Sequence, residues 1–185
     1  MGSCGVFIKR KEDAVVEKIW YSILTSLNNI GYVGRMSVEV DGKDSIKSIE
    51  EVYRYENGRW LLRNNRIVCD MKEITAYEYP FSDESLFSGK YLMMYVPTQE
   101  VLGWDDSPMY EWMGRGDSLT GTFIIEDKFE RGEMLLRFVE DYLRLNPNDI
   151  FYNEQDWYYT KDDIDKIIEK KVDPETWHCI NPAEI

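Results

Sequence analysis

Histidine and cysteine are scarce in this 185-residue sequence, which has one histidine and three widely separated cysteines, Cys4, Cys69 and Cys179. No Cys-x-x-Cys or His-Glu-x-x-His pattern occurs, which excludes a zinc ribbon, a thioredoxin-type redox site and a zinc peptidase. His178 and Cys179 are adjacent, and adjacent side chains usually point in different directions, which argues against a catalytic thiol and its base. We predict no metal and no cofactor, and free thiols in a reducing compartment.

Long apolar runs are absent as well. No stretch approaches the roughly 20 apolar residues that a membrane helix needs, and the N-terminus lacks the apolar region of a signal peptide. Met1-Gly2-Ser3-Cys4 is similar to the start of a myristoylation site, but Val6 stands where that pattern requires serine or threonine. The sequence therefore predicts a cytoplasmic protein without a membrane attachment.

Basic residues are outnumbered by acidic ones. The chain has 35 Asp and Glu against 22 Lys and Arg, a formal net charge of −13. A nucleic-acid binder is expected to be basic, so nucleic acid is an unfavourable partner. A strongly acidic protein attracts basic partners through its long-range field. Acidic residues also improve solubility, which is the alternative explanation of the charge.

The hydrophobic pattern predicts several strands flanked by helices. Glu12–Asn29 has one apolar face at helical spacing and predicts an amphipathic helix. Asp41-Gly42 and Asn57-Gly58 are typical hairpin turns. The continuous apolar run Tyr91–Val96 is typical of a central strand that is buried on both faces. Further strands are expected at Gly5–Lys9, Met36–Val40, Ile49–Tyr55, Arg59–Leu62, Ile67–Cys69, Ile74–Tyr79 and Leu119–Glu126.

The stretch from residue 128 to 171 is the most regular part of the chain. An apolar stripe from Met134 to Leu143 predicts a helix, which Asn146-Pro147 ends. Asp149–Tyr159 is rich in aromatic residues and predicts one strand. Thr160, with Asp163 three positions later, predicts a capping box that opens a further helix.

This order of elements indicates an α+β fold. Strands gather in the middle of the chain and do not alternate with helices, which favours a mostly antiparallel sheet. We predict a single domain over residues 1–171, with the central sheet packed by an N-terminal helix and two C-terminal helices. Residues 172–185 are expected to form an irregular C-terminal tail.

One short motif suggests an enzyme. Gly116-Asp117-Ser118-Leu119 resembles the signature of the GDSL esterase family, in which the serine is the nucleophile. The resemblance covers four residues and implies a distant Asp-x-x-His partner. Here the residue three positions before His178 is Glu175, so the partner motif is missing. A turn that leads into the strand at Leu119 is the preferred interpretation.

Two segments combine acidic and aromatic residues. Gly103–Met113 contains Pro108 and an Asp-Asp-Ser run, which predicts a surface loop. Asp149–Asp165 repeats the combination. Aromatic anchors inside an acidic rim suit the docking of a basic protein. The predicted partner-binding residues are Trp104, Asp105, Asp106, Tyr110, Glu111, Trp112, Glu154, Asp156 and Trp157.

These features favour a non-enzymatic binding or inhibitor protein over an enzyme. In size, charge and composition the chain resembles the diverse bacterial toxin-immunity proteins, although no motif carries this resemblance. It implies an immunity protein that neutralises a basic, nuclease-type toxin by covering its active site with acidic and aromatic side chains. In the opposing interpretation, the rings pack the core and the acids simply face solvent.

Two alternatives remain open. Glu154 and Asp156, two residues apart on a strand, would face the same side and could serve a small carboxylate-based hydrolase or a small-molecule-binding domain. A closed pocket with a raised carboxyl pKa would favour that function. The other alternative is a DNA mimic from a phage or mobile element, which would use its acidic surface against a DNA-binding protein.

Overall fold

The structure is a computed structural model of the chain. It describes ten stretches: residues 5–40, 43–56, 59–62, 71–78, 91–97, 113, 118–126, 131–153, 155 and 157–185. The strands are β1 (Gly5–Arg10), β2 (Tyr32–Val40), β3 (Lys43–Ser48), β4 (Tyr53–Glu56), β5 (Arg59–Leu62), β6 (Met71–Glu78), β7 (Tyr91–Pro97), β8 (Leu119–Glu126), β9 (Ile150–Tyr152) and β10 (Tyr158–Tyr159). The α-helices are α1 (Val16–Asn29), α2 (Ile49–Val52), α3 (Gly132–Leu145) and α4 (Lys161–Glu169). The 3₁₀ turns are η1 (Lys11–Asp13), η6 (Trp177–Cys179) and η7 (Pro182–Glu184).

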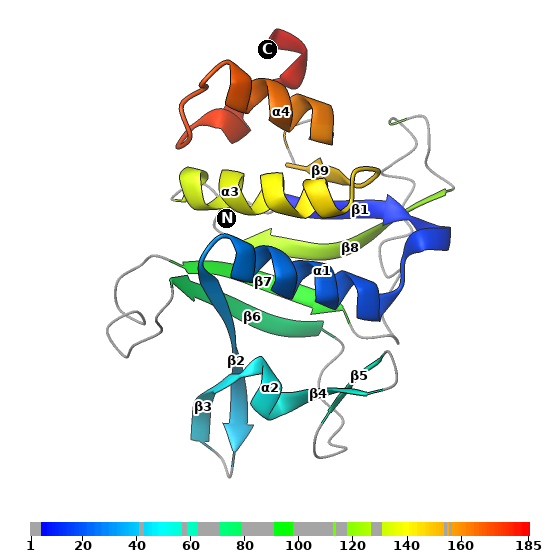
Figure 1. The fold of residues 1–185 in the computed structure, drawn as a ribbon, viewed down its shortest axis with the longest axis vertical. Helices are drawn as coiled ribbons and strands as arrows, with labels where there is room; N and C mark the ends of the chain where they lie inside the picture. Colours follow the sequence, from blue (N-terminus) through cyan, green and yellow to red (C-terminus); the bar gives the residue numbers. More distant parts are fainter. Residues whose placement is uncertain are drawn as a thin grey trace.

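Eight of the described strands form one sheet, in the order β10-β9-β1-β8-β7-β6-β2-β3, while β4 and β5 pair separately. Every neighbouring pair in the large sheet is antiparallel. Figure 1 shows α1 and α3 lying across the same face of this sheet. The predicted α+β fold with a mostly antiparallel sheet is therefore confirmed.

Helices α1 and α3 bury their apolar stripes in one main core with the sheet. Residues three and four apart share a helix face, so each stripe meets the sheet continuously. The buried apolar side chains of α1 are Val16, Ile19, Trp20, Ile23 and Leu27, and those of α3 are Met134, Leu135, Leu136, Phe138, Val139, Tyr142 and Leu143.

A row of aromatic rings crosses the helix-covered face of the sheet. The strand register places Tyr159, Phe151, Phe7 and Phe123 opposite one another on β10, β9, β1 and β8. The rings of Phe7 and Phe123 are stacked with centroids 4.3 Å apart, and Phe151 lies 5.0 Å from Phe7. A Cβ atom on Gly5 would lie 2.5 Å from the Phe151 ring, so this position needs glycine.

Strand β7 is interior, as predicted, but it is not buried on both faces. Leu92, Met94 and Val96 are completely buried, whereas the alternate residues Tyr91, Met93 and Tyr95 are half-buried. An antiparallel sheet with helices on one face buries alternate residues most deeply. The apolar run therefore reflects one fully buried face and one of large, partly exposed side chains.

Both predicted hairpins are confirmed. Val40 pairs with Lys43 and Glu56 pairs with Arg59, which places the two turn dipeptides between the paired strands. The strand predicted from Ile49 is wrong over its first four residues, which form α2. A capping box explains the helix: the Glu51 N–H donates to Ser48 Oγ (3.2 Å), and the Ser48 N–H donates to a Glu51 carboxylate oxygen (2.7 Å). The strand predicted at Ile67–Cys69 lies outside the described residues.

The three long helices occur where the sequence predicts them. Helix α1 begins at Val16 rather than Glu12, because Lys11–Asp13 form a separate 3₁₀ turn. Helix α3 ends at Leu145, immediately before Asn146-Pro147. The capping box at α4 is present. Thr160 is the N-cap, and its backbone N–H donates a hydrogen bond to the Asp163 carboxylate.

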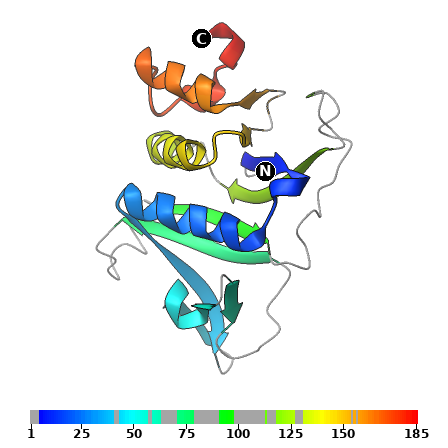
Figure 2. The same cartoon turned by 45° about the vertical axis from the view of Figure 1, so that its right-hand side comes forward.

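The last residues of the chain pack onto the rest of the protein. Figures 1 and 2 place α4 and the C-terminus beyond α3, at the end of the molecule opposite the β2–β3 hairpin. Apart from two 3₁₀ turns, residues 172–185 are irregular, yet Trp177 in this segment is completely buried in the main core. Across the part of the chain that the structure describes, every helix is too short or too polar to span a bilayer.

The Thr160 cap provides a test of the fold. Replacing Thr160 by alanine removes the acceptor for the Asp163 N–H, and we expect the free energy of unfolding to fall by about 1 kcal/mol. Thr176 is the matched control, because it precedes η6 but makes no side-chain cap hydrogen bond. Thr176→Ala should change stability by less than about 0.5 kcal/mol in urea denaturation. Equal losses in both variants would contradict the assigned role of the cap.

Candidate functional site

Of the nine predicted partner-binding residues, the structure describes Trp157. The residues Trp104, Asp105, Asp106, Tyr110, Glu111, Trp112, Glu154 and Asp156 lie outside the described residues. Trp157 is half-buried and packs against the main core, and its indole N–H donates to Tyr159 Oη at 2.9 Å. Part of this ring remains accessible, which is compatible with a contact role.

The strand predicted over Asp149–Tyr159 is wrong. The segment contains two short strands, β9 and β10, which pair antiparallel with Tyr152 opposite Tyr158. The five-residue connection Asn153–Trp157 joins them at one edge of the sheet. Glu154 and Asp156, predicted to lie on one face of a strand, are outside the described residues.

Tyr159 lies just after this connection and makes hydrogen bonds to residues on both sides of it. Its ring is completely buried beside Trp177, with ring centroids 5.0 Å apart. Its hydroxyl accepts from Trp157 and donates to the Ile180 carbonyl oxygen at 2.7 Å. Burial raises the pKa of the Tyr159 hydroxyl well above its ordinary value of 10.0. The hydroxyl is therefore neutral at physiological pH and can donate and accept at the same time.

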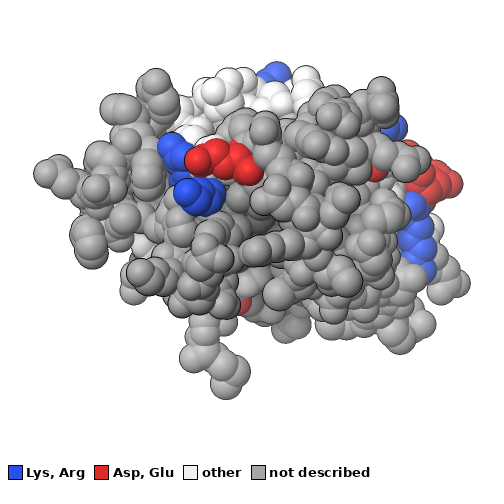
Figure 3. Space-filling view, turned by 90° about the horizontal axis from the view of Figure 1, so that it is seen from below, with Lys and Arg blue, Asp and Glu red and all other residues white. Residues whose placement is uncertain are grey.

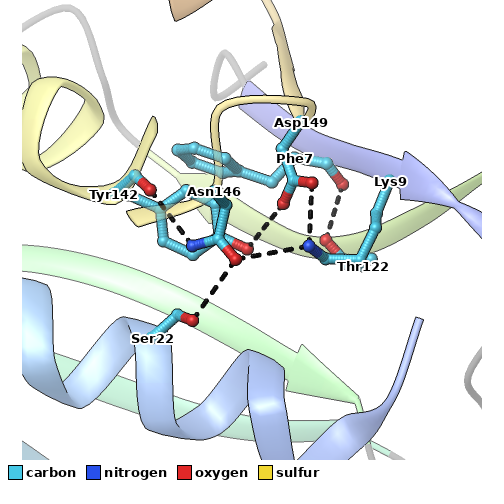
Figure 4. A network of polar contacts seen from close by, with 7 residues as sticks. All are labelled: Phe7, Lys9, Ser22, Thr122, Tyr142, Asn146 and Asp149. Carbon is cyan, nitrogen blue, oxygen red and sulfur yellow. Dashed lines mark hydrogen bonds and ion pairs between the residues drawn. The ribbon is translucent and has the colours of Figure 1, made fainter. Parts of the chain in front are cut away.

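A second polar cluster lies where β1, α1 and the end of α3 meet (Figure 4). Lys9 Nζ lies 2.8 Å from Asp149 Oδ1 and 3.3 Å from Asn146 Oδ1. The Tyr142 hydroxyl donates to Asp149 Oδ2 at 3.1 Å, and Ser22 Oγ donates to Asn146 Oδ1 at 3.4 Å. We refer to Lys9, Ser22, Tyr142, Asn146 and Asp149 as the Lys9–Asp149 cluster.

The Lys9–Asp149 cluster is closed to solvent. The side chain of Lys9 is 9% exposed and that of Asp149 is 3% exposed. Burial raises the pKa of Asp149 above 3.8, although the Lys9 charge and the hydrogen bonds from Lys9 and Tyr142 act in the opposite direction. Burial also raises the pKa of Tyr142 well above its ordinary value, and the neighbouring Asp149 carboxylate reinforces that shift.

These contacts indicate a structural role. Each Asp149 carboxylate oxygen already accepts a hydrogen bond from within the protein, and a carboxylate that is almost fully buried cannot reach a substrate. A raised carboxyl pKa would favour an enzyme in an open pocket, but here it results from burial in the closed interior of the protein. No sequence pattern predicts this contact between residues 140 apart. The one sequence feature that indicates a buried charge here is the position of Lys9 directly after the apolar residues Val6-Phe7-Ile8.

The other candidate chemical groups do not converge. Ser118 is exposed immediately before β8, which agrees with the predicted turn before Leu119, and His178 is 1% exposed. Cys179 is a free, exposed thiol next to that buried histidine. In the described part of the chain, no three His, Cys, Asp or Glu side chains are arranged to hold a metal ion.

Comparisons of the chain with protein-family models, with curated proteins and with solved structures found no match.

A double-mutant cycle tests the buried ion pair. Lys9→Met leaves the Asp149 carboxylate buried without its counter-ion, so we expect the free energy of unfolding to fall by about 3–5 kcal/mol. Asp149→Asn should also destabilise the protein, while the double variant should cost less than the sum of the two, by about 0.5–3 kcal/mol. Lys18→Met, at an exposed position of α1, is the control and should change stability by less than about 0.5 kcal/mol. Additive losses at the two buried positions would mean that they are not coupled.

The pH dependence of stability tests the environment of Asp149. Between 3.8 and its raised pKa, the folded state binds more protons at Asp149 than the unfolded state does. The free energy of unfolding of the wild type should therefore fall, relative to Asp149→Asn, as the pH rises through this interval, and then stay constant. Urea denaturation of both proteins at several pH values measures this difference. A wild type that gains relative stability as the pH rises would show that pairing with Lys9 outweighs burial.

Proposed function

We propose that this chain is a non-enzymatic binding protein that holds a basic protein partner through an acidic surface bearing tryptophan and tyrosine rings. The observation that carries the proposal is the charge balance. Even if every one of the 22 basic residues paired with an acid, 35 − 22 = 13 carboxylates would have no basic partner within the chain. Such an excess attracts a positively charged surface.

Internal ion pairs do not remove this excess, because each pair is neutral. The face in Figure 3 carries both basic and acidic side chains among its described residues. Helix α4 has the same arrangement, with Lys161 paired to Asp165 and Lys166 to Asp163. These exposed pairs contribute little stability. The proposed binding carboxylates are those at positions 105, 106, 111, 154 and 156.

The aromatic part of the proposed surface comprises Trp104, Tyr110, Trp112 and Trp157. Trp157 supports it, since its half-buried side chain is fixed by a hydrogen bond to Tyr159 and directly follows Asp156 in the sequence. A fixed aromatic ring loses little conformational entropy on binding, and such rings often dominate binding energy.

In its specific form the proposal is a bacterial immunity protein that acts in the cytoplasm. Its carboxylates would occupy the basic cleft of a nuclease-type toxin, where substrate phosphates bind, and its rings would supply most of the affinity. The hydrolase alternative depends on Glu154 and Asp156, which lie outside the described residues. The DNA-mimic alternative shares the acidic surface and differs in the partner, which would be a DNA-binding protein.

The proposal is tested by affinity capture from lysate of the source organism at low and high salt. The bait proteins are the wild type, Glu154→Lys/Asp156→Lys, and the charge-matched control Asp162→Lys/Glu169→Lys on the exposed face of α4. We expect one stoichiometric basic protein, identified by mass spectrometry, to be retained by the wild type and the control. The first variant should lose it, and high salt should weaken retention.

Each other outcome is informative. If both double variants lose the captured protein equally, binding depends on the total charge of the chain and not on a defined surface. Retention of an acidic protein, or of none at either salt concentration, would contradict the proposed function. A captured DNA-binding protein without toxin activity would favour the DNA mimic.

A further inference from the structure

We draw no further inference here: the strongest candidate, the half-buried patch of Met93, Tyr95, Ile124 and Tyr152 on the sheet face opposite α1 and α3, carries none because nothing in the structure shows what covers it.

Discussion

The buried ion pair between Lys9 and Asp149 is the constraint on which the arrangement of the C-terminal third depends. An ammonium group is stable inside a protein only beside a compensating charge with good geometry, and the 2.8 Å contact meets that condition. Asp149 stands between α3 and β9, so the pair fixes the turn after α3 against β1. By fixing this turn, the ion pair also positions β9, β10 and the segments that pack on them.

Local signals in the sequence predicted most of the fold. The two hairpins, the apolar stripes of α1 and α3 and the capping box at Thr160 each depend on residues close together in the chain. The structure shows the paired strands of both hairpins, both stripes and the capping box. The errors arose where two local preferences compete. Ile49–Val52 suits a strand by composition, but the Ser48–Glu51 capping box makes it helical. Asp149–Tyr159 has aromatic residues near both ends, which favoured one strand, although the polar run at residues 153–156 separates β9 from β10.

The candidate site was predictable only in part, for a related reason. Composition identified Trp157 and its acidic neighbours, because a cluster of rings and carboxylates is visible in the sequence itself. The contacts of Asn153 and Tyr159 with His178 and Ile180 join residues more than 20 positions apart, and nothing local indicates them. The segment expected to be an irregular tail is instead packed into the fold, with Trp177 completely buried.

The position of β1 in the sheet has a consequence for biosynthesis. Strand β1 lies between β8 and β9, and Lys9 pairs with a residue that is made 140 positions later. At a translation rate of about 5–20 residues per second, this delay is roughly 7–28 s. One edge of β1 pairs with β8, and the other edge stays unpaired until β9 has been made. The sheet can therefore close on both sides of β1 only after β9 has left the exit tunnel.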